Sequence, residues 1–345
     1  MSLRQIAASL GLSVTTVSRA LADYSDVAEE TRRRVREEAG RIGYVPNATA
    51  RRLQKGRADA VGIAATSGFG ALDDSHLSSG FVGAWTRLAE LGQDLLLLPT
   101  DDTGASADGR SPVAVAALQR AVGERRVDGM LLMRPRRSDA RIDSLTGAGL
   151  PFVLLDAEMA ERPELTAIGI DNREAARLVC ERLVHLGHRR CIVVGPQEDF
   201  DFSLSRFEHF EAQAAAFGLT METIRAPAGE AGGRSAVERI LADRPDPPPP
   251  LIFLTNRMTV GGLTALGRGP WVVGHTVTVI GFGDSPSLRH GLPAVTVVQS
   301  PMFEMGRHAV DALMAQRDGR PFEVVARWKP TIELRHSDCP PPAAT

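Results

Sequence analysis

The chain has 345 residues, of which 43% are hydrophobic and 24% charged, so it can bury a sizeable core and is not disordered overall. Its apolar runs are far shorter than the ~18 residues of a membrane span, and no apolar signal segment opens it. These features predict a cytoplasmic protein with no membrane partner. Residues 1–57 hold eleven Lys and Arg against six Asp and Glu, which gives this segment a net charge of +5. The whole chain has a net charge of −2, so the remaining residues carry −7. A basic head of this kind suggests contact with a polyanion.

The first part of the chain predicts three short helices. Ser2 and Gln5 form a capping box ahead of the first helix. Gly11 breaks that helix, and Ser13 can cap the second. A third amphipathic helix is expected from about residue 28 to residue 42. Two short helices joined by a glycine-containing turn are typical of a helix-turn-helix, a motif that binds DNA.

From residue 61 onward, short aliphatic runs alternate with amphipathic helical segments, a pattern typical of parallel sheets with helices on both faces. The number of runs indicates two lobes rather than one small sheet. The expected strands are residues 61–65, 95–98, 130–133, 152–155, 191–194, 251–254, 277–280 and 295–298. The Pro- and Ala-rich end of the chain, residues 337–345, is predicted to be a disordered tail.

Several residue types that often mark chemistry lack a supporting pattern. Three scattered cysteines, an odd number, argue against a disulfide framework or a zinc site. His185 and His188 have the spacing of a metal pair, but Gly187 interrupts the helix between them, so a structural role is expected. The sequence has no G-x-S-x-G, P-loop or Rossmann glycine fingerprint. We therefore expect no enzyme, no bound cofactor and no metal.

Two stretches, LRQIAASLGLSVTTVSRAL and TRRRVREEAGRIGYVPNATARRL, resemble the head of lactose-repressor (LacI/GalR) family regulators. The resemblance continues through LLDAEM, IGIDNREAARLVCERLVHLGHRRCIVVGP, VTVIGFGD and VTVVQSPMFEMGRHAVDAL, and so covers nearly the whole chain. It implies an all-α helix-turn-helix head and a periplasmic-binding-protein-like core of two doubly wound α/β lobes. The implied parts are the head (1–46), a hinge helix and linker (47–60) and an effector-binding and dimerisation core (61–336). Lobe 1 would hold about 61–170 and 299–325, and lobe 2 about 171–298 and 326–336.

By this resemblance, the second helix lies in the major groove of DNA and presents its first residues to the bases. Val14 offers apolar contact to a thymine methyl, and Thr15 can add a hydrogen bond. Arg19 can bind a guanine through two hydrogen bonds or hold a phosphate, while Thr16 and Ser18 suit phosphates. The alternative is that all five are ordinary surface residues of a small helical domain.

Residues 47–54 resemble the family's hinge helix, which Asn47 can cap. Leu53 stands where family members insert an apolar side chain into the minor groove and bend the DNA. Ala50 is small enough to approach the groove closely. Neighbouring cations would neutralise phosphates: Arg51, Arg52, Lys55 and Arg57. The alternative for Leu53 is a core position on a short helix.

The carboxyl ends of strands in open α/β sheets border the ligand crevice, where the resemblance places a sugar-like effector. Asp156 follows an expected strand and would accept hydrogen bonds from hydroxyls, while the planar fork of Arg206 would clamp vicinal oxygens. Alternatively, these two form a plain surface ion pair. Asp171 and Asn172 either touch the ligand or cap a helix. The other candidate effector contacts are Ser67, Phe69, Asn256 and Gln299.

Some residues depart from the family pattern and leave the effector's identity open. Gln5 changes only the first helix cap, His209 could reshape the surroundings of Arg206, and Asn256 removes a negative charge. Gly283 replaces the first residue of a common Asp pair. Two arginines bear on the charge of the ligand: Arg134 and Arg257. If they face inward an anionic sugar is favoured, and if they point to solvent the ligand is a neutral sugar.

The sequence thus predicts a DNA-binding transcriptional repressor whose operator binding is controlled allosterically by a small sugar-like effector in the interlobe cleft. A homodimer on near-palindromic double-stranded DNA is expected, since one head reads only a few base pairs. No heptad repeat follows the core, which argues against a coiled-coil tetramer. The alternatives are an activator on the same scaffold, or a sugar-binding receptor without DNA function.

Overall fold

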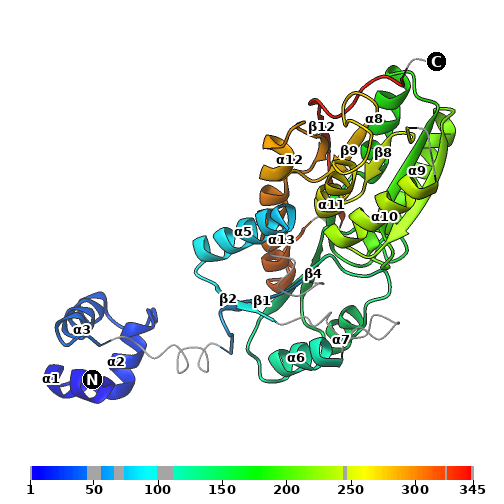
Figure 1. The fold of residues 1–345 in the computed structure, drawn as a ribbon. Coiled ribbons are helices and arrows are strands. Elements are labelled where there is room, and N and C mark those ends of the chain that lie inside the picture. The colour runs from blue at the N-terminus through cyan, green and yellow to red at the C-terminus, as the bar shows by residue number, and fades with distance from the viewer. Residues whose placement is uncertain are drawn as a thin grey trace. The chain divides into compact units, whose positions relative to one another are not determined.

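The computed structural model describes residues 2–44, 56–65, 74–98, 112–243, 247–322 and 325–342. The chain folds into two compact units, Met1–Asp59 and Ala60–Thr345 (Figure 1). Within the described ranges, no helix is both long and apolar enough to cross a membrane.

The first unit, the head, contains three helices, α1 (Leu3–Leu10), α2 (Val14–Leu21) and α3 (Glu29–Arg41). The predicted caps are confirmed. The Ser2 backbone N–H donates to Gln5 Oε1 at 2.8 Å, and the Thr16 N–H donates to Ser13 Oγ at 3.0 Å. Gly11 ends α1 with a φ of 66°, a left-handed conformation that glycine adopts without strain.

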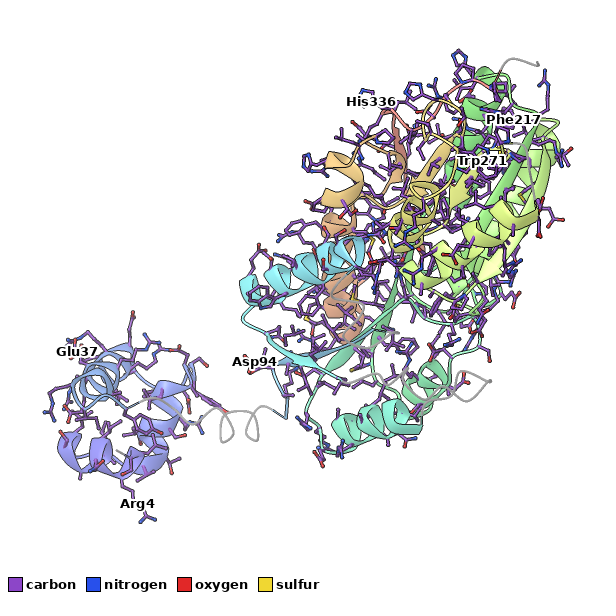
Figure 2. All side chains as sticks on the ribbon, viewed as in Figure 1. Arg4, Glu37, Asp94, Phe217, Trp271 and His336 are labelled. Atoms are coloured by element: carbon purple, nitrogen blue, oxygen red, sulfur yellow. The ribbon has the colours of Figure 1, made fainter. Side chains whose placement is uncertain are left out.

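Four side chains that the solvent does not reach fill the centre of the head: Ile6, Val17, Ala20 and Val35. They come from all three helices, so this unit has its own small core. Charged side chains such as Arg4 and Glu37 lie on its surface (Figure 2).

The second unit, the core, contains two six-stranded sheets. The first lobe holds β1 (Ala60–Ala65), β2 (Asp94–Leu97), β3 (Gly129–Met133), β4 (Phe152–Leu155), β5 (Ala167–Ile170) and β11 (Val325–Trp328). Its strands run in the order β11-β5-β4-β3-β1-β2, and every neighbouring pair is parallel. The helices on one face are α5 (Ser75–Glu90) and α13 (Met302–Arg317), and those on the other are α6 (Pro112–Gly123) and α7 (Ala140–Ala148).

The second lobe has the strand order β12-β10-β9-β8-β6-β7, in which only β10 and β12 pair antiparallel. Its strands are β6 (Arg190–Pro196), β7 (Thr220–Ala226), β8 (Leu251–Phe253), β9 (Val279–Phe282), β10 (Thr296–Gln299) and β12 (Thr331–Glu333). Helices α8 (Asn172–His185) and α9 (Asp201–Ala216) cover one face, and α10 (Glu230–Asp243) and α11 (Asn256–Leu266) cover the other. A short helix, α12 (Pro286–His290), precedes β10.

All eight predicted strands are present, and four further strands were missed. Edge strand β7 has the largely polar sequence TMETIRA and is mostly exposed, so it lacks the aliphatic signal of a buried strand. Strands β5, β11 and β12 have only three or four residues each. Because β11 pairs with β5, the last crossing between the lobes follows Trp328, slightly later than the expected boundary at residue 325.

The predicted disordered tail is wrong for residues 337–339. Ser337 is fully buried, where its Oγ donates to the carbonyl of Val279 at 2.6 Å and accepts from the N–H of Thr296 at 2.8 Å. The N–H of Cys339 donates to Thr278 Oγ1 at 3.0 Å. These bonds fasten the tail to β9 and β10, which composition alone does not reveal because the partners lie far away in sequence.

We expect Ser337→Ala to destabilise the core by about 1–3 kcal/mol, because it leaves a buried N–H and a buried carbonyl unpaired. Urea unfolding of the full chain measures this change. Ser235→Ala, at an exposed serine whose Oγ donates to the Gly232 carbonyl within α10, is the control, and its loss of stability should be much smaller. Equal stability of Ser337→Ala and wild type would show that the tail is not held as described.

Candidate functional site

The outer surface of α2 presents the residues that were predicted to meet DNA. Val14 and Thr15 are exposed at its first turn, and Ser18 is half-buried. Thr16 takes part in the helix cap, since its Oγ1 also lies 2.8 Å from Ser13 Oγ. The first turn of α2 can therefore offer a methyl-rich contact and a hydroxyl to a base edge.

Arg19 has partners within the head. Its guanidinium forms an ion pair with Asp26 and lies 4.7 Å from the centre of the Tyr24 ring. The bond with Asp26 raises the pKa of Arg19, so the side chain stays charged. Its side chain is 41% exposed, and a base contact requires it to leave or share Asp26.

Eight predicted contact residues lie outside the described residues. Six belong to the predicted DNA-binding segment: Asn47, Ala50, Arg51, Arg52, Leu53 and Lys55. The other two are the candidate effector contacts Ser67 and Phe69.

A second site lies between the two lobes, where the carboxyl ends of neighbouring strands meet. Arg134 directly follows β3 and Asp156 directly follows β4. Both have positive φ, 48° and 60°, a strained conformation for residues with a Cβ. Such strain persists only where the surroundings enforce it, and it often accompanies function.

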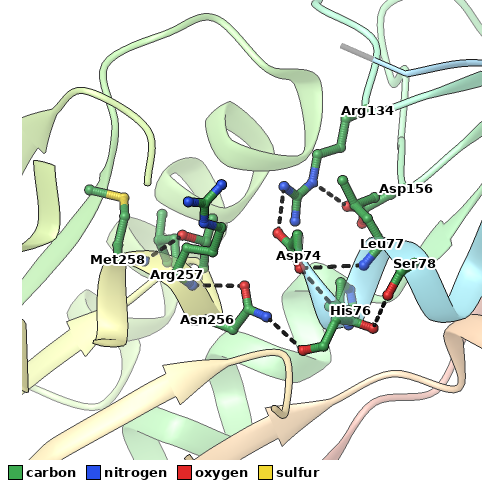
Figure 3. Close-up of polar contacts among 12 residues, drawn as sticks. Asp74, His76, Leu77, Ser78, Arg134, Asp156, Asn256, Arg257 and Met258 are labelled. Carbon is green, nitrogen blue, oxygen red and sulfur yellow. Dashed lines mark hydrogen bonds and ion pairs between the residues drawn. The ribbon is translucent and has the colours of Figure 1, made fainter. Parts of the chain in front are cut away.

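Two carboxylates and two guanidinium groups form a closed cluster at this site, which we call the quartet: Asp74, Arg134, Asp156 and Arg206. Arg134 Nη1 lies 2.9 Å from Asp74 Oδ2, and Arg134 Nε lies 3.3 Å from Asp156 Oδ2 (Figure 3). Arg206, from α9 in the other lobe, places Nη2 3.6 Å from Asp156 Oδ1. Asp156 therefore contacts an arginine from each lobe.

Two phenylalanine rings lie against the guanidinium of Arg206. The carbon at its centre lies 4.7 Å from the ring centre of Phe202 and 4.8 Å from that of Phe282. Arg134 approaches the same Phe202 ring at 4.9 Å. Cation–π contacts of this kind fix the position of a guanidinium without using its hydrogen-bond donors.

The quartet is charged despite its burial. Burial alone would raise the pKa of Asp74 and Asp156, but the neighbouring arginines outweigh it and hold both values below the usual range. Burial lowers the pKa of Arg206 to about 10, which still leaves it charged at neutral pH. The adjacent His76 has its pKa lowered by burial, so its neutral form prevails near pH 7.

The start of α5 links the two lobes through hydroxyl and amide groups. Asn256 Nδ2, in the second lobe, donates to Ser75 Oγ at 3.2 Å, and Ser75 Oγ in turn donates to the carbonyl of Asp284 at 3.1 Å. An aspartate at position 256 could not donate this bond, which gives a reason for Asn256. Gln299 ends β10 half-exposed, and its side chain has no polar contact among the described residues.

Gly283 and His76 form a complementary pair. A Cβ at Gly283 would lie 3.1 Å from the His76 ring, and the backbone there has a φ of 77°. A side chain at this position would be strained and would press on the ring. This explains why glycine replaces the first residue of the common Asp pair.

A second set of contacts joins the lobes beside the quartet. The loop after β3 pairs with the start of α9 through two backbone bonds of 3.0 Å, from Arg137 N–H to the Asp199 carbonyl and from Asp201 N–H to the Pro135 carbonyl. Arg137 also pairs with Glu208 at 2.6 Å. These contacts hold the lobes together around the quartet.

The other sequence candidates have structural roles. Asp171 Oδ1 accepts from the Glu174 N–H at 2.9 Å and so caps α8. Asn172 accepts from Arg206 Nε at 3.2 Å and donates to Glu158 at 3.2 Å. His209 lies 3.4 Å from the same Glu158 carboxylate, so it reaches Arg206 only through this chain of bonds.

His188 contacts the tail: its Nε2 lies 2.8 Å from the Cys339 carbonyl. Within the described ranges, no group of three or more His, Cys, Asp or Glu side chains is placed to hold a metal.

The structure thus brings together Asp156 and Arg206, as the resemblance implied, and turns Arg134 inward. Sequence reasoning missed Asp74, His76 and Phe202. Asp74 caps α5 through its Oδ1, which accepts from the N–H of His76 at 3.0 Å. An Asp just ahead of the helix that follows the first strand was the available signal, because Asp is a favoured N-cap residue.

Comparisons with known proteins agree with this architecture. Residues 2–47 match the model of bacterial regulatory proteins of the lacI family, and residues 180–337 match a periplasmic binding protein-like domain. The Escherichia coli "HTH-type transcriptional regulator RafR" is 31% identical over 341 residues, which cover 96% of each chain. The chain belongs to the LacI family. It is a DNA-binding transcriptional regulator rather than an enzyme.

Other transcriptional regulators extend the likeness. The "HTH-type transcriptional regulator AglR" of Rhizobium meliloti is 27% identical over 353 residues, 99% of this chain and 95% of that protein. A lac repressor dimer bound to operator and the anti-inducer ONPF superposes with a TM-score of 0.82, at 22% identity over 98% of this chain and 99% of that one. A CelR–cellobiose complex has a TM-score of 0.72, at 24% identity and the same two coverages.

The quartet predicts a specific dependence of stability on pH. The pKa of Asp156 in the folded chain lies below its unfolded value of ~3.9, so its contribution is complete above that pH and is lost as the pH falls through the folded pKa. The difference in unfolding free energy between wild type and Asp156→Asn should therefore be largest above about pH 5 and shrink on acidification. Urea unfolding between pH 3 and 7 measures it.

Asp143→Asn is the surface control for this series, since the Asp143 side chain is 74% exposed. Its difference from wild type should be small throughout. If the difference in unfolding free energy between wild type and Asp156→Asn stayed constant down to pH 3, it would contradict a charged Asp156 in the folded core.

Proposed function

We propose that this regulator is a repressor that binds near-palindromic operator DNA as a homodimer and changes its operator affinity when a small sugar-like molecule binds between the lobes. The observation that carries the proposal is the quartet, because its members come from both lobes and meet at the carboxyl ends of the strands. A ligand there contacts both lobes at once.

The chemistry of the interlobe site suits hydroxyl groups. Asp156 can accept hydrogen bonds from a diol, and Arg206 can donate to a pair of oxygens. Asn256 and Gln299 add amide groups, and Ser67 and Phe69 are proposed to complete the lining. The CelR structure that resembles this chain is described as a complex with cellobiose.

Burial couples ligand entry to lobe movement. The side chains of the quartet are between 1% and 11% exposed, so a ligand reaches them only when the lobes part or the side chains rearrange. A ligand that prefers one angle between the lobes shifts the population towards it. We propose that this shift orders or frays the hinge, residues 47–54, and thereby alters DNA binding.

The DNA side of the proposal rests on the head. Exposed Val14 and Thr15 open α2, and the segment from residue 1 to residue 57 has a net charge of +5. We propose that Leu53 enters the minor groove, with Asn47 and Ala50 on the hinge, while Arg51 and Lys55 neutralise phosphates. Thr16 and Ser18 would bond to phosphates near the major groove.

The homodimer is supported by apolar surface on the first lobe. Val82 and Trp85, one turn apart on α5, are 41% and 54% exposed. A related structure is described as a lac repressor dimer on operator. A two-fold dimer places two heads on two half-sites, which requires a near-palindrome.

Selection from a random double-stranded DNA library tests the proposed DNA binding directly. Duplexes retained by the full-length protein should converge on a near-palindrome, and light scattering should give a dimer both free and on the selected duplex. Convergence on a single half-site, or a monomer on that duplex, would contradict the proposed homodimer. A library in which no sequence is enriched would contradict sequence-specific DNA binding.

Arg19→Ala should weaken binding to the selected operator about 10- to 100-fold while changing affinity for random DNA less, because a guanine contact specifies sequence. Asp26→Asn is the matched variant, since it releases Arg19 from its ion pair without removing the guanidinium. The Asp26→Asn variant should still bind the selected operator more tightly than random DNA. If both variants lost affinity equally on both DNAs, Arg19 would be a structural residue of the head.

A further inference from the structure

The charges of the quartet cancel: Asp74 and Asp156 carry two negative charges, and Arg134 and Arg206 carry two positive ones. Each arginine faces a carboxylate within 3.6 Å, and Arg134 spans both carboxylates. The chain therefore supplies its own counter-ions at the point where a ligand would meet both lobes.

We infer that Arg134 sets the charge class of the effector, so that the site accepts an uncharged polyhydroxylated molecule and excludes its carboxylate or phosphate counterpart. This inference rests on the proposed function and deepens it. It also decides between the neutral and anionic sugars that the sequence left open.

Each of the three nitrogens of Arg206 already has a partner. Its Nη1 donates to the Leu254 carbonyl at 2.7 Å, its Nε donates to Asn172 Oδ1 at 3.2 Å, and its Nη2 faces Asp156. The rings of Phe202 and Phe282 cover the guanidinium. An incoming anion that took Arg206 from Asp156 would leave that carboxylate buried without this partner.

Charged groups around the quartet are also paired. Arg257, the second arginine that could have favoured an anion, lies 3.7 Å from Glu230. Asp284 pairs with Arg335 at 2.8 Å and with Arg289 at 2.7 Å. The lowered pKa of His76 keeps that ring neutral near pH 7. None of these groups offers an uncompensated positive charge to a ligand.

The cost of desolvation explains why a site whose own charges cancel favours an uncharged ligand. Moving an ion from water into a buried site costs several kcal/mol unless a partner of opposite charge awaits it. A hydroxyl costs far less and can donate to a carboxylate or accept from an arginine. With its charges already matched, the site offers hydroxyls many partners and an extra anion none.

Arg134 is the member that creates the balance. It is the arginine in direct contact with Asp74, whose other bonds are N-cap bonds from the backbone of α5. Without Arg134, two buried carboxylates would share Arg206 alone and the site would carry a net negative charge. Without Asp74, Arg134 and Arg206 would share Asp156, and the site would carry a net positive charge.

The test uses Asp74→Asn in the full-length protein, because asparagine caps a helix as well as aspartate does. The control is Asp139→Asn, which makes the same change at another buried N-cap that also pairs with an arginine, Arg141. Thermal unfolding is measured at constant ionic strength with sodium formate and with three matched pairs: glucose and gluconate, galactose and galactonate, and cellobiose and cellobionate.

For wild type and Asp139→Asn, we expect no acid to stabilise more than its neutral partner, and no response to formate at the quartet. Formate should raise the unfolding temperature of Asp74→Asn by at least ~2 °C more than it raises that of wild type or Asp139→Asn. The acids should also stabilise Asp74→Asn more, relative to their neutral partners, than they stabilise wild type. A wild type that prefers any acid, or an Asp74→Asn variant that gains nothing from formate, would overturn the inference.

The outcomes also separate this inference from the proposed function. A sugar acid that bound wild type and changed operator affinity would leave the proposed function intact and refute the charge rule. Conversely, an Asp74→Asn variant that recruits formate would support the charge rule even if no DNA sequence were selected.

Discussion

The contact of Asp156 with an arginine from each lobe is the interaction on which the rest of the core depends. Asp156 lies 3.3 Å from Arg134 in its own lobe and 3.6 Å from Arg206 in the other. A buried carboxylate cannot remain charged without such partners, and the arginines cannot remain buried without it. The relative position of the lobes and the protonation of this cluster are therefore linked.

The surrounding structure keeps this cluster in place. Helix α5 begins at the site and packs on α13 so closely that a Cβ at Gly83 would lie 2.0 Å from the Phe303 carbonyl oxygen. The start of α9 is held by Asp201, whose Oδ2 accepts from the backbone of Glu158 at 2.6 Å and of Met159 at 3.0 Å. A ligand that rearranges the quartet thus acts on elements of both lobes.

The sequence predicted what local patterns and family motifs encode. The helix caps at Ser2 and Ser13 and the aliphatic strands follow from short-range rules, and the presence of Asp156 and Arg206 at one site follows from the resemblance. The inward turn of Arg134 did not follow, because Asp74, its partner, precedes it by sixty residues. The buried tail was missed for the same reason, since the bonding partners of Ser337 lie 41 and 58 residues before it.

If binding between the lobes controls binding to DNA, as proposed, operator affinity must change during titration with a ligand. Fluorescence anisotropy of a selected operator duplex would be measured across a panel of neutral sugars, for wild type and for Asp156→Ala. We expect at least one sugar to change the operator affinity of wild type at least ~5-fold, and no sugar to change that of Asp156→Ala. An equal response in both proteins, or no response of wild type to any sugar, would contradict it.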